Sequence, residues 1–546
     1  MTPEILDLLF PNKLPTVDEI LAKYPPRQLP EGARVMRVAP SPTGKMHVGT
    51  LYQALLAERA AHQSGGVFYL RLEDTDQKRE LQGAAELIIS SLARYGICLD
   101  EGVGVDGKDM GAYGPYTQSQ RKEIYQVFAK SLAEKDMAYP CFCSAEDIEM
   151  RRKIQTKQGL RPGYYGSHAK CRNLTDEEVL ANLKAGKPWV LRFKAPGKYE
   201  NQIVVKDLMK GNLSLPENDM DIVILKSDGL PTYHFAHAVD DHLMGTTVVS
   251  RGDEWLSSLP LHIQLFVALG WKPPKYAHLA PIQKIDDGNR RKLSKRLDPE
   301  ASITYFWEHG YPEEAQVEYL LNLLNASFED WRRANPTLPA FDFPMNFNKI
   351  SNTAGALFDF VKLHSIAREV VARMSAEQVY DAALKWAKEY KPEFATLLEN
   401  NHEKCIAIFN IERGIGAKSR KDLFKWEDAE HETEFFFNRP SYDESLLTPM
   451  THADIQKVAA DFANLYDPAD DNQAWFAKVK QVAEQNGFAT DMKAYKADPS
   501  GFKGSVADVA KILRVAITGR TQSPDLCSIM KILGKDEVVE RLKING

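Results

Sequence analysis

Cysteine is scarce in this chain, with 6 residues among 546. That number cannot supply a disulfide framework for a chain of this length, so we expect a reducing compartment, the cytoplasm. No apolar run approaches the roughly 18 to 20 residues that a membrane helix needs. The first residues, MTPEILDLLFPNK, lack the basic leader and the apolar core of a secretory signal. The sequence therefore predicts a cytoplasmic protein that does not cross a membrane.

The chain also lacks a charge excess of either sign, because 69 Lys and Arg face 75 Asp and Glu, a net charge of −6. Any nucleic-acid surface must then be a local basic patch. Apolar residues make up 44 % and charged residues 26 %, which excludes collagen-like and disordered classes. The chain holds neither internal repeats nor low-complexity tracts, and 546 residues are too many for one compact core. These features predict a multidomain enzyme.

The first clear structural pattern is a strand, a helix and a second strand. Residues 34–39 are β-prone, the Pro/Gly-rich turn 40–44 follows, and a helical stretch over 47–62 precedes a strand at 67–73. This order is a βαβ unit and predicts a parallel sheet. A further strand, near 246–250, returns the chain to that sheet. The predicted fold class is therefore α/β.

Other regions have different patterns. Residues 1–33 contain two short helical stretches and are interpreted as an appended arm, and 137–243, with its charged helix at 145–157, is interpreted as an inserted domain. Beyond the Pro-rich boundary 336–344, helical periodicity dominates, and residues 375–378 form a capping box. Apolar stripes at helical spacing follow at 379–390, 455–465 and 506–517, the last of which stops at Gly519. The sequence thus predicts a helical C-terminal region.

The helix after the first turn begins with His47 and Gly49. Free backbone N–H groups at a helix start favour an anionic phosphate. His47 can add a hydrogen-bond donor to a phosphate that gains negative charge in a transition state. Gly49 has no Cβ, so a nucleobase or ribose can approach the backbone. The segment matches neither the Walker phosphate-binding loop nor the GxGxxG motif of dinucleotide-binding proteins. A helix-capping role for His47 is the structural alternative.

A second candidate is the segment 291–296, which contains the cations Arg291, Lys292, Lys295 and Arg296. Because these cations follow a Gly-containing turn, they predict a loop that clamps a polyphosphate; a solvated surface loop is the alternative. This loop and the turn before His47 fall in the two halves of one predicted sheet. Together they resemble the HIGH and KMSKS pair of class I aminoacyl-tRNA synthetases.

The resemblance narrows to the bacterial glutamyl-tRNA synthetases. Six motifs stand in that family's order, and a seventh, LRVAITGR at 513–520, resembles its final domain. The six are RVAPSPTG at 37–44, LRLEDTD at 70–76, DGLPTYH at 228–234, VDDH at 239–242, RGDEW at 251–255 and KLSKR at 292–296. The resemblance spans residue 34 to the C-terminus, so only the N-terminal arm lies outside it.

This resemblance implies a Rossmann-type catalytic domain with an inserted domain, followed by helical anticodon-binding domains. The implied domains are a catalytic half at 34–136, an acceptor-end-binding insertion at 137–243, a second catalytic half with the stem-contact region at 244–344, and the anticodon-binding region at 345–546. The implied reaction has two steps, ATP-dependent formation of glutamyl-adenylate and acyl transfer to the 3′ end of tRNA. The partners are then tRNA, ATP with Mg²⁺ and L-glutamate, and the expected state is a monomer.

The resemblance also implies the site residues. Arg37, Ser41, Glu73, Tyr233 and Arg251 would bind glutamate, since guanidinium forks pair with its carboxylates and Glu73 accepts its ammonium group. ATP would be bound by His47, Gly49, Thr50, Glu254, Trp255 and Lys295, with His47, Lys292 and Lys295 as the catalytic residues. Catalysis would be positioning and charge stabilisation, because the glutamate α-carboxylate is itself the nucleophile.

The sequence departs from the family in its details. Thr50 replaces the last histidine of the first motif, and His237 stands near the amino-acid pocket where some members carry Asn. Cys141 and Cys143, with Cys171 downstream and Tyr165 or His168 as a fourth ligand, resemble a zinc site found in part of the family. The spacing before Cys171 differs from that of the zinc-binding members. We therefore predict no bound metal, with structural zinc as the alternative.

Arg413, Arg420 and Lys421 are interpreted as a tRNA-binding patch before Trp426, with a charge-balanced surface as the alternative. Three other functions compete with glutamate–tRNA ligation. A glutaminyl-specific enzyme usually carries β-barrel anticodon domains, and a small-molecule nucleotidyltransferase of the same Rossmann type needs no helical module. The third alternative is an RNA-binding scaffold without catalytic activity, and such a scaffold would have no use for His47 and Lys295. The sequence leaves open whether the glutamine tRNA is also charged, and what the arm does.

Overall fold

The predicted parallel sheet is present in the computed structural model, which describes residues 1–546 except 77–80, 347–348, 351–354, 415–418 and 545–546. Its first half holds β1 (Val35–Val38), β2 (Val67–Leu70) and β3 (Glu101–Val103), all parallel, with β4 (Asp109–Met110) antiparallel at the edge. α3 (Val48–His62) links β1 to β2. The βαβ prediction is therefore confirmed.

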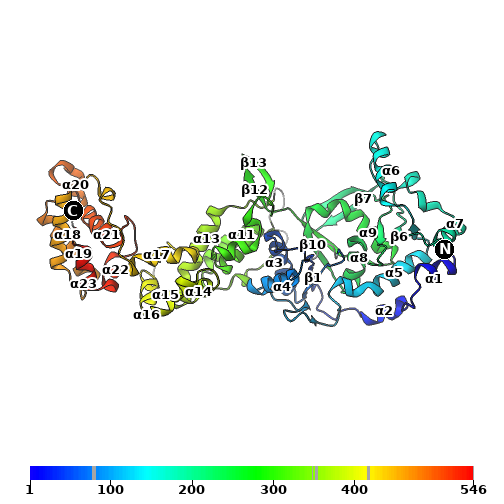
Figure 1. The fold of residues 1–546 in the computed structure, drawn as a ribbon, viewed down its shortest axis with the longest axis horizontal. Coiled ribbons are helices and arrows are strands. Elements are labelled where there is room, and N and C mark those ends of the chain that lie inside the picture. Colours follow the sequence, from blue (N-terminus) through cyan, green and yellow to red (C-terminus); the bar gives the residue numbers. More distant parts are fainter. Residues whose placement is uncertain (77–80, 347–348, 351–354, 415–418, 545–546) are drawn as a thin grey trace. The chain divides into compact units, whose positions relative to one another are not determined.

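The second half of the sheet comes from residues far along the chain. β10 (Val248–Gly252) and β11 (Lys275–Leu279) are parallel, and β7 (Gln202–Asp207) with β8 (Gly211–Pro216) continues this sheet beyond β11. The N–H of Thr247 donates to the carbonyl of Val35 at 3.0 Å, so β10 lies beside β1. α8 (Tyr233–Leu243) and α9 (Leu259–Ala268) pack against each other next to these strands (Figure 1).

Between the two halves, β5 (Ala138–Cys141), β6 (Val190–Phe193) and β9 (Val223–Leu225) form a separate antiparallel sheet. α6 (Ala145–Lys157) has the predicted bounds, and α7 (Asp176–Lys184) follows it. The N-terminal helices α1 (Pro3–Leu9) and α2 (Val17–Lys23) contribute to one apolar cluster with α5 (Lys122–Glu134). Ile5 and Ile20 are buried in it, so the arm is packed onto the protein.

Contact density divides the chain into two compact units. The first unit holds Met1–Tyr305 and Val317–Asp359, and the second holds Phe306–Gln316 and Phe360–Gly546. The Pro-rich segment 336–344, interpreted above as a boundary, lies inside the first unit. The ring of Phe343 packs on those of Phe328 and Trp331, at centroid distances of 5.2 and 5.5 Å.

The remaining helices and strands before residue 335 are one helix between β2 and β3 and a group that follows β11. They are α4 (Ala84–Arg94), the hairpin β12 (Gln283–Asp286) and β13 (Asn289–Lys292), α10 (Ile303–Glu308), α11 (Glu313–Leu324) and α12 (Ser327–Ala334). Figure 1 shows the β12–β13 hairpin standing away from the sheet.

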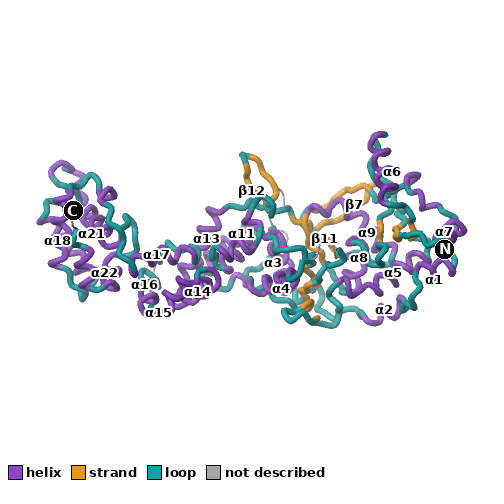
Figure 2. Tube along the Cα trace, in the orientation of Figure 1, coloured by secondary structure: helices purple, strands orange, loops and turns teal. Residues whose placement is uncertain are grey.

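The regular structure of the second unit is helical (Figure 2). Its helices are α13 (Phe360–Arg373), α14 (Ala376–Tyr390), α15 (Pro392–Asn400), α16 (His402–Asn410), α17 (Glu427–Phe437), α18 (His452–Leu465), α19 (Asn472–Gln485), α20 (Met492–Ala497), α21 (Val506–Thr518), α22 (Leu526–Leu533) and α23 (Lys535–Arg541). The predicted capping box is confirmed, since Ser375 Oγ accepts from Gln378 N at 3.2 Å. α21 ends at Gly519, whose φ of 69° suits glycine.

Apolar side chains of these helices gather into separate cores. One core lies between α14, α15 and α16 and includes Trp386 and Phe394, and another lies among α18, α19, α21 and α22 and includes Phe462 and Leu513. In the part of the chain that the structure describes, no helix is both long enough and apolar enough to span a membrane.

Candidate active site

His47 is the residue that begins α3, directly after the turn that follows β1. Its Nδ1 accepts a hydrogen bond from the N–H of Gly49 at 2.8 Å, so the ring proton of the neutral form is on Nε2. Burial and the charges of Lys295 and Lys292 lower the pKa of His47 from 6.5 to about 4. The histidine therefore caps the helix, and its second ring nitrogen carries an N–H that interacts with the backbone of Leu293.

A cavity of about 140 Å³ lies beside this helix start. His47, Gly49, Thr50, Glu254 and Lys292 line it, and all five were predicted to serve ATP or catalysis. A Cβ placed on Gly49 would lie 3.0 Å from Nδ1 of His47, so glycine leaves room for the imidazole ring. Side chains from α3, β13 and the turn after β10 thus meet in one small pocket.

The second cationic segment, 291–296, begins in strand β13 of the hairpin and reaches the same pocket. Lys292 Nζ lies 3.4 Å from Glu254 Oε1, and Lys295 Nζ donates to the backbone carbonyl of Lys45, in the turn before α3. Arg291 is used differently, because its Nη1 and Nη2 donate to the buried carboxylate of Asp298 at 2.6 and 2.8 Å. Arg291 therefore anchors the hairpin and is not an open polyphosphate ligand.

A larger cavity, of about 630 Å³, opens at the carboxyl ends of β1 and β10. All five residues predicted to bind glutamate line it: Arg37, Ser41, Glu73, Tyr233 and Arg251. Trp255 also lines this cavity rather than the smaller one, and its ring centroid lies 4.2 Å from that of Tyr233. The structure thus brings together residues that are more than 200 positions apart in the sequence.

Buried ion pairs hold the polar floor of this cavity. Asp241, on α8, lies 3.2 Å from Arg37 Nε and 2.6 Å from Arg71 Nη1, and Arg71 Nη2 donates to Glu73 at 3.0 Å. Burial alone would raise the pKa of Asp241, but the guanidinium groups of Arg37 and Arg71 hold it well below its usual value. The VDDH motif therefore places a permanent carboxylate beneath the pocket.

Other lining residues had no assigned role at the sequence level: Gln53, Thr75, Asp76, Gln118 and Lys226. Asp76 belongs to the quoted LRLEDTD motif, whereas Gln118 and Lys226 carry no local signal. Lys226 Nζ donates to the carbonyl of Thr75 at 2.7 Å, which ties β9 to the chain after β2. Gln53, on α3, lines both cavities and so marks the place where they adjoin.

His237 does not line either cavity. It is buried behind Tyr233, with the two rings stacked at a centroid distance of 6.0 Å, and its Nε2 lies 3.1 Å from the hydroxyl of Tyr276. His237, at the position where some family members carry Asn, thus packs against the buried side of the Tyr233 ring.

Two of the three residues of the predicted tRNA patch are occupied inside the second unit. Arg413 donates to the carbonyls of Phe409 and Met374 at 2.8 and 3.2 Å, and Arg420 is buried with its Nε 2.6 Å from Asp422. Lys421 is exposed and pairs with Glu369. The two arginines therefore stabilise the fold, and the patch as predicted reduces to Lys421.

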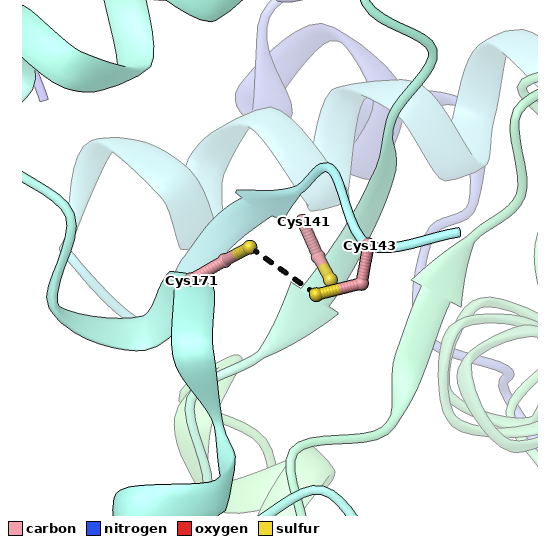
Figure 3. Close-up of side chains that lie close together, drawn as sticks. All are labelled: Cys141, Cys143 and Cys171. Carbon is pink, nitrogen blue, oxygen red and sulfur yellow. Dashed lines mark hydrogen bonds between the residues drawn. The ribbon is translucent and has the colours of Figure 1, made fainter. Parts of the chain in front are cut away.

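Cys141, Cys143 and Cys171 gather at the end of β5, with Sγ atoms that all lie within 4.8 Å of one another (Figure 3). The hydroxyl of Tyr164 lies 3.4 Å from Sγ of both Cys141 and Cys143. The two residues predicted as the fourth ligand point elsewhere, since Tyr165 donates its hydroxyl to Arg161 O at 2.8 Å and its ring packs on that of His168, 5.9 Å away. The donor set is thus three thiols and the phenol of Tyr164.

The thiols influence one another. Hydrogen bonds from Cys143 and Cys171 hold the pKa of Cys141 below its usual value. Three thiols at this spacing fit a tetrahedral zinc ion, which takes thiolate ligands in structural sites. The residues present therefore suit the zinc ion that the sequence left as the alternative to a metal-free cluster.

Comparisons with known proteins agree with this geometry. Residues 34–332 match the family described as tRNA synthetases class I (E and Q), catalytic domain, and residues 420–545 match the anticodon binding domain family. The chain is 45% identical over 544 residues to the glutamate–tRNA ligase of Clostridium perfringens strain SM101, covering 99% of this chain and 98% of that one. It is 46% identical over 544 residues to the glutamate–tRNA ligase of Acetivibrio thermocellus, covering 99% of both.

A solved structure is also similar. The crystal structure of a glutamate tRNA ligase from Elizabethkingia meningosepticum, in complex with its amino acid, covers 93% of this chain and 98% of that one, with a TM-score of 0.74 and 28% identity. Sequence and fold thus agree over nearly the whole length. The chain belongs to the glutamate–tRNA ligase family of class I tRNA synthetases.

Proposed function

We propose that this chain joins glutamate to tRNA in two steps. Glutamate and ATP give glutamyl-adenylate and pyrophosphate, and the glutamyl group then passes to the 3′ end of tRNA. One observation carries this proposal: the five residues expected for glutamate line one cavity, four of the six expected for ATP (His47, Gly49, Thr50 and Glu254) line a second, and Gln53 lines both. Two substrates held in adjoining pockets can react by positioning alone.

In the larger cavity, Arg37 and Arg251 would pair with the two carboxylates of glutamate, because a guanidinium fork matches a carboxylate bidentately. Glu73 would accept the ammonium group, and the hydroxyls of Ser41 and Tyr233 would add hydrogen bonds. Glutamine would bind poorly, since its neutral amide leaves a buried guanidinium without a counter-charge.

In the smaller cavity, Gly49, Thr50 and Glu254 would hold ATP, with Trp255 at the border of the two pockets. His47 would donate its Nε2–H to the phosphate, and Lys292 and Lys295 would neutralise the charge that develops on the leaving pyrophosphate. The α-carboxylate of glutamate attacks the α-phosphorus and the bond to the pyrophosphate breaks, so no side chain serves as nucleophile. Mg²⁺ that arrives with ATP would share the phosphate charge.

The helical unit would bind tRNA, consistent with the anticodon binding domain match at 420–545. Lys421, whose ammonium group is half exposed, is the member of the predicted patch that would contact phosphate. We propose a monomer that works in the cytoplasm, without a membrane partner. Cys141, Cys143 and Cys171 would hold a structural zinc ion with the help of Tyr164, and that ion would stabilise the inserted domain rather than take part in the reaction.

The test is aminoacylation by the purified protein with separate tRNAs for glutamate and for glutamine. Glutamate should be attached to the glutamate tRNA, and glutamine should be attached to neither. Attachment of glutamine would instead identify the glutaminyl enzyme. Adenylyl transfer from ATP without any tRNA acceptor would favour the small-molecule nucleotidyltransferase.

A further inference from the structure

Arg251 is buried in the wall of the larger cavity, yet none of its hydrogen bonds to described residues reaches a carboxylate. Nε donates to His278 Nε2 at 3.0 Å, Nη1 lies 2.9 Å from His262 Nδ1, and Nη2 donates to the carbonyl of Trp255 at 3.4 Å. The guanidinium carbon also lies 4.8 Å from the ring centroid of Tyr276. The cation thus sits among neutral acceptors.

His278 is held from behind. It lies on β11, directly opposite Arg251 in the register of the parallel pair, and its Nδ1 lies 2.7 Å from Asp207 Oδ2 on β7. Asp207 also accepts from the backbone N–H groups of Met209 and Lys210, at 2.8 and 3.0 Å. Three neighbouring strands therefore fix the plane of the His278 ring.

His262 is held in a similar way on the other side. It lies on α9, and its Nε2 is 2.9 Å from Nδ1 of His234 on α8. The His262 ring is fully buried, and it packs on the ring of His237 at a centroid distance of 4.6 Å. Two helices thus set its position.

The donor inventory allows one arrangement of protons along this row. Arg251 can only donate, so Nε2 of His278 and Nδ1 of His262 must both offer lone pairs. The proton of His278 is then on Nδ1, donated to Asp207, and the proton of His262 is on Nε2, donated to His234. Burial lowers the pKa of both His262 and His278, which keeps the two rings neutral.

Arg37, the other arginine that lines the pocket, differs from Arg251 in its hydrogen-bond partners. Arg37 lies 3.2 Å from Asp241, so it already has a carboxylate partner. Arg251 has five N–H groups, and the three contacts described above leave one on each terminal nitrogen. A buried cation with neutral partners is costly until an anion reaches it. The substrate carboxylate is that anion.

We propose that His262 and His278 are positioning residues that hold the Arg251 guanidinium in the glutamate pocket and leave its charge for the substrate carboxylate. This inference rests on the proposed function. The histidines supply hydrogen bonds without countering the charge, so the pocket favours a carboxylate over an amide. A carboxylate in place of either histidine would orient Arg251 equally well. It would also neutralise the guanidinium charge, so that Arg251 would no longer require the substrate carboxylate as its counter-charge.

The test compares variants that keep the acceptor with variants that remove it. In His278→Gln the amide oxygen can take the place of Nε2, and in His262→Asn it can take the place of Nδ1, whereas His278→Leu and His262→Leu offer no acceptor. The Leu variants should raise the KM for glutamate by about tenfold or more, with the KM for ATP within about twofold of the wild type. The Gln and Asn variants should stay within about threefold of the wild-type KM for glutamate.

A matched control is His242→Gln, because His242 is a partly buried histidine that lies outside both cavities. It lies on α8, and its ring stacks on that of Trp271, 3.9 Å away. This variant should change the unfolding temperature and not the KM for glutamate. Glutamate titrations by calorimetry supply a second readout, in which the Leu variants should lose affinity by the same factor. If His278→Leu fails to fold, the comparison of His262→Leu with His262→Asn tests the inference.

Two results would overturn the inference alone while the wild type attaches glutamate to tRNA. One is an unchanged glutamate KM in both Leu variants. The other is a loss in the Gln and Asn variants as large as that in the Leu variants, since the acceptor would then be irrelevant. A wild-type protein that does not use glutamate would overturn the proposed function, and this inference with it.

Discussion

Asp241 lies 3.2 Å from Arg37, and this buried ion pair joins helix α8 to strand β1. The two residues are 204 positions apart in the chain. The pair therefore links the assembly of the sheet to the geometry of the glutamate pocket, because Arg37 lines the cavity while Asp241 holds it from below.

Asp241→Asn should lower both stability and glutamate binding. Removing one partner of a buried ion pair typically costs about 3 to 5 kcal/mol, since the remaining charges are left uncompensated. Urea unfolding should show a loss of that order, and the KM for glutamate should rise. Asp228→Asn, which removes an exposed carboxylate 3.1 Å from Lys226, serves as the control and should be nearly neutral. Equal effects of the two substitutions would refute the structural role of Asp241.

Lys295→Ala should slow adenylate formation by about two orders of magnitude or more, because a charged donor to a transition-state phosphate contributes about 3 kcal/mol. Glutamate binding should stay nearly intact. The measurement is glutamate-dependent exchange of pyrophosphate into ATP, in the presence of tRNA. Arg290→Ala removes an exposed cation from the same hairpin and should leave the exchange rate nearly unchanged. An unaltered rate in Lys295→Ala would remove this lysine from the mechanism.

The buried histidines should make the protein sensitive to mild acid. Burial lowers the pKa of His234 and His237 from 6.5 to about 4, so the unfolded chain binds more protons than the folded one between these values. Stability is then complete above about pH 6.5 and falls as the pH drops towards 4. The contribution of a fully buried histidine such as His237 to the free energy of unfolding falls by about 2 kcal/mol between about pH 7 and about pH 5. Unfolding temperatures that stay constant from pH 7 to pH 5 would contradict this expectation.

The cysteine cluster gives a prediction that separates metal binding from plain packing. Protein purified without chelators should contain about one zinc ion per chain, and Cys143→Ser should lower both the metal content and the unfolding temperature. Cys98→Ser, which changes an exposed thiol outside the cluster, should alter neither. Elemental analysis decides the matter. A metal-free protein would support the prediction from the sequence that Cys141, Cys143 and Cys171 bind no metal.

A chain truncated after Asp359 should aggregate. Phe306, Trp307 and Tyr311 belong to the second unit and are nearly fully buried, so removing Phe360–Gly546 exposes them. Exposed aromatic clusters of this kind favour association. Light scattering measures the outcome, with the full chain as control. A monomeric truncated protein that still charges tRNA would show that the helical unit is dispensable both for solubility and for tRNA recognition.

Much of the fold follows from local patterns in the sequence. The βαβ unit, the helix α6 and the capping box at Ser375 depend on residues close together in the chain, and all three form as predicted. The carboxyl-end rule for parallel strands accounts for the pocket that Arg37 and Arg251 share, since they lie near the carboxyl ends of β1 and β10.

Properties set by tertiary contacts could not be predicted in this way. Arg420 and Arg291 look like free cations in the sequence, yet both pair with carboxylates inside the fold. The fourth donor of the cysteine cluster is Tyr164 rather than its neighbour, because a shift of one residue reverses which side chain faces inward. Lys226 lines the pocket from the residue directly after β9, a strand whose place in space no local pattern reveals.

The hydrogen bonds between Val35 and Thr247 join residues 212 positions apart. On a ribosome that adds about 5 to 20 residues per second, roughly 10 to 40 seconds pass between the synthesis of β1 and the synthesis of Thr247. During that time one side of β1 is an unpaired strand edge, the kind of surface on which chains aggregate. The inserted domain, whose antiparallel sheet is complete before Thr247 is made, has time to fold first. The order of synthesis thus makes the catalytic sheet the late product of folding, assembled around a domain that is already in place.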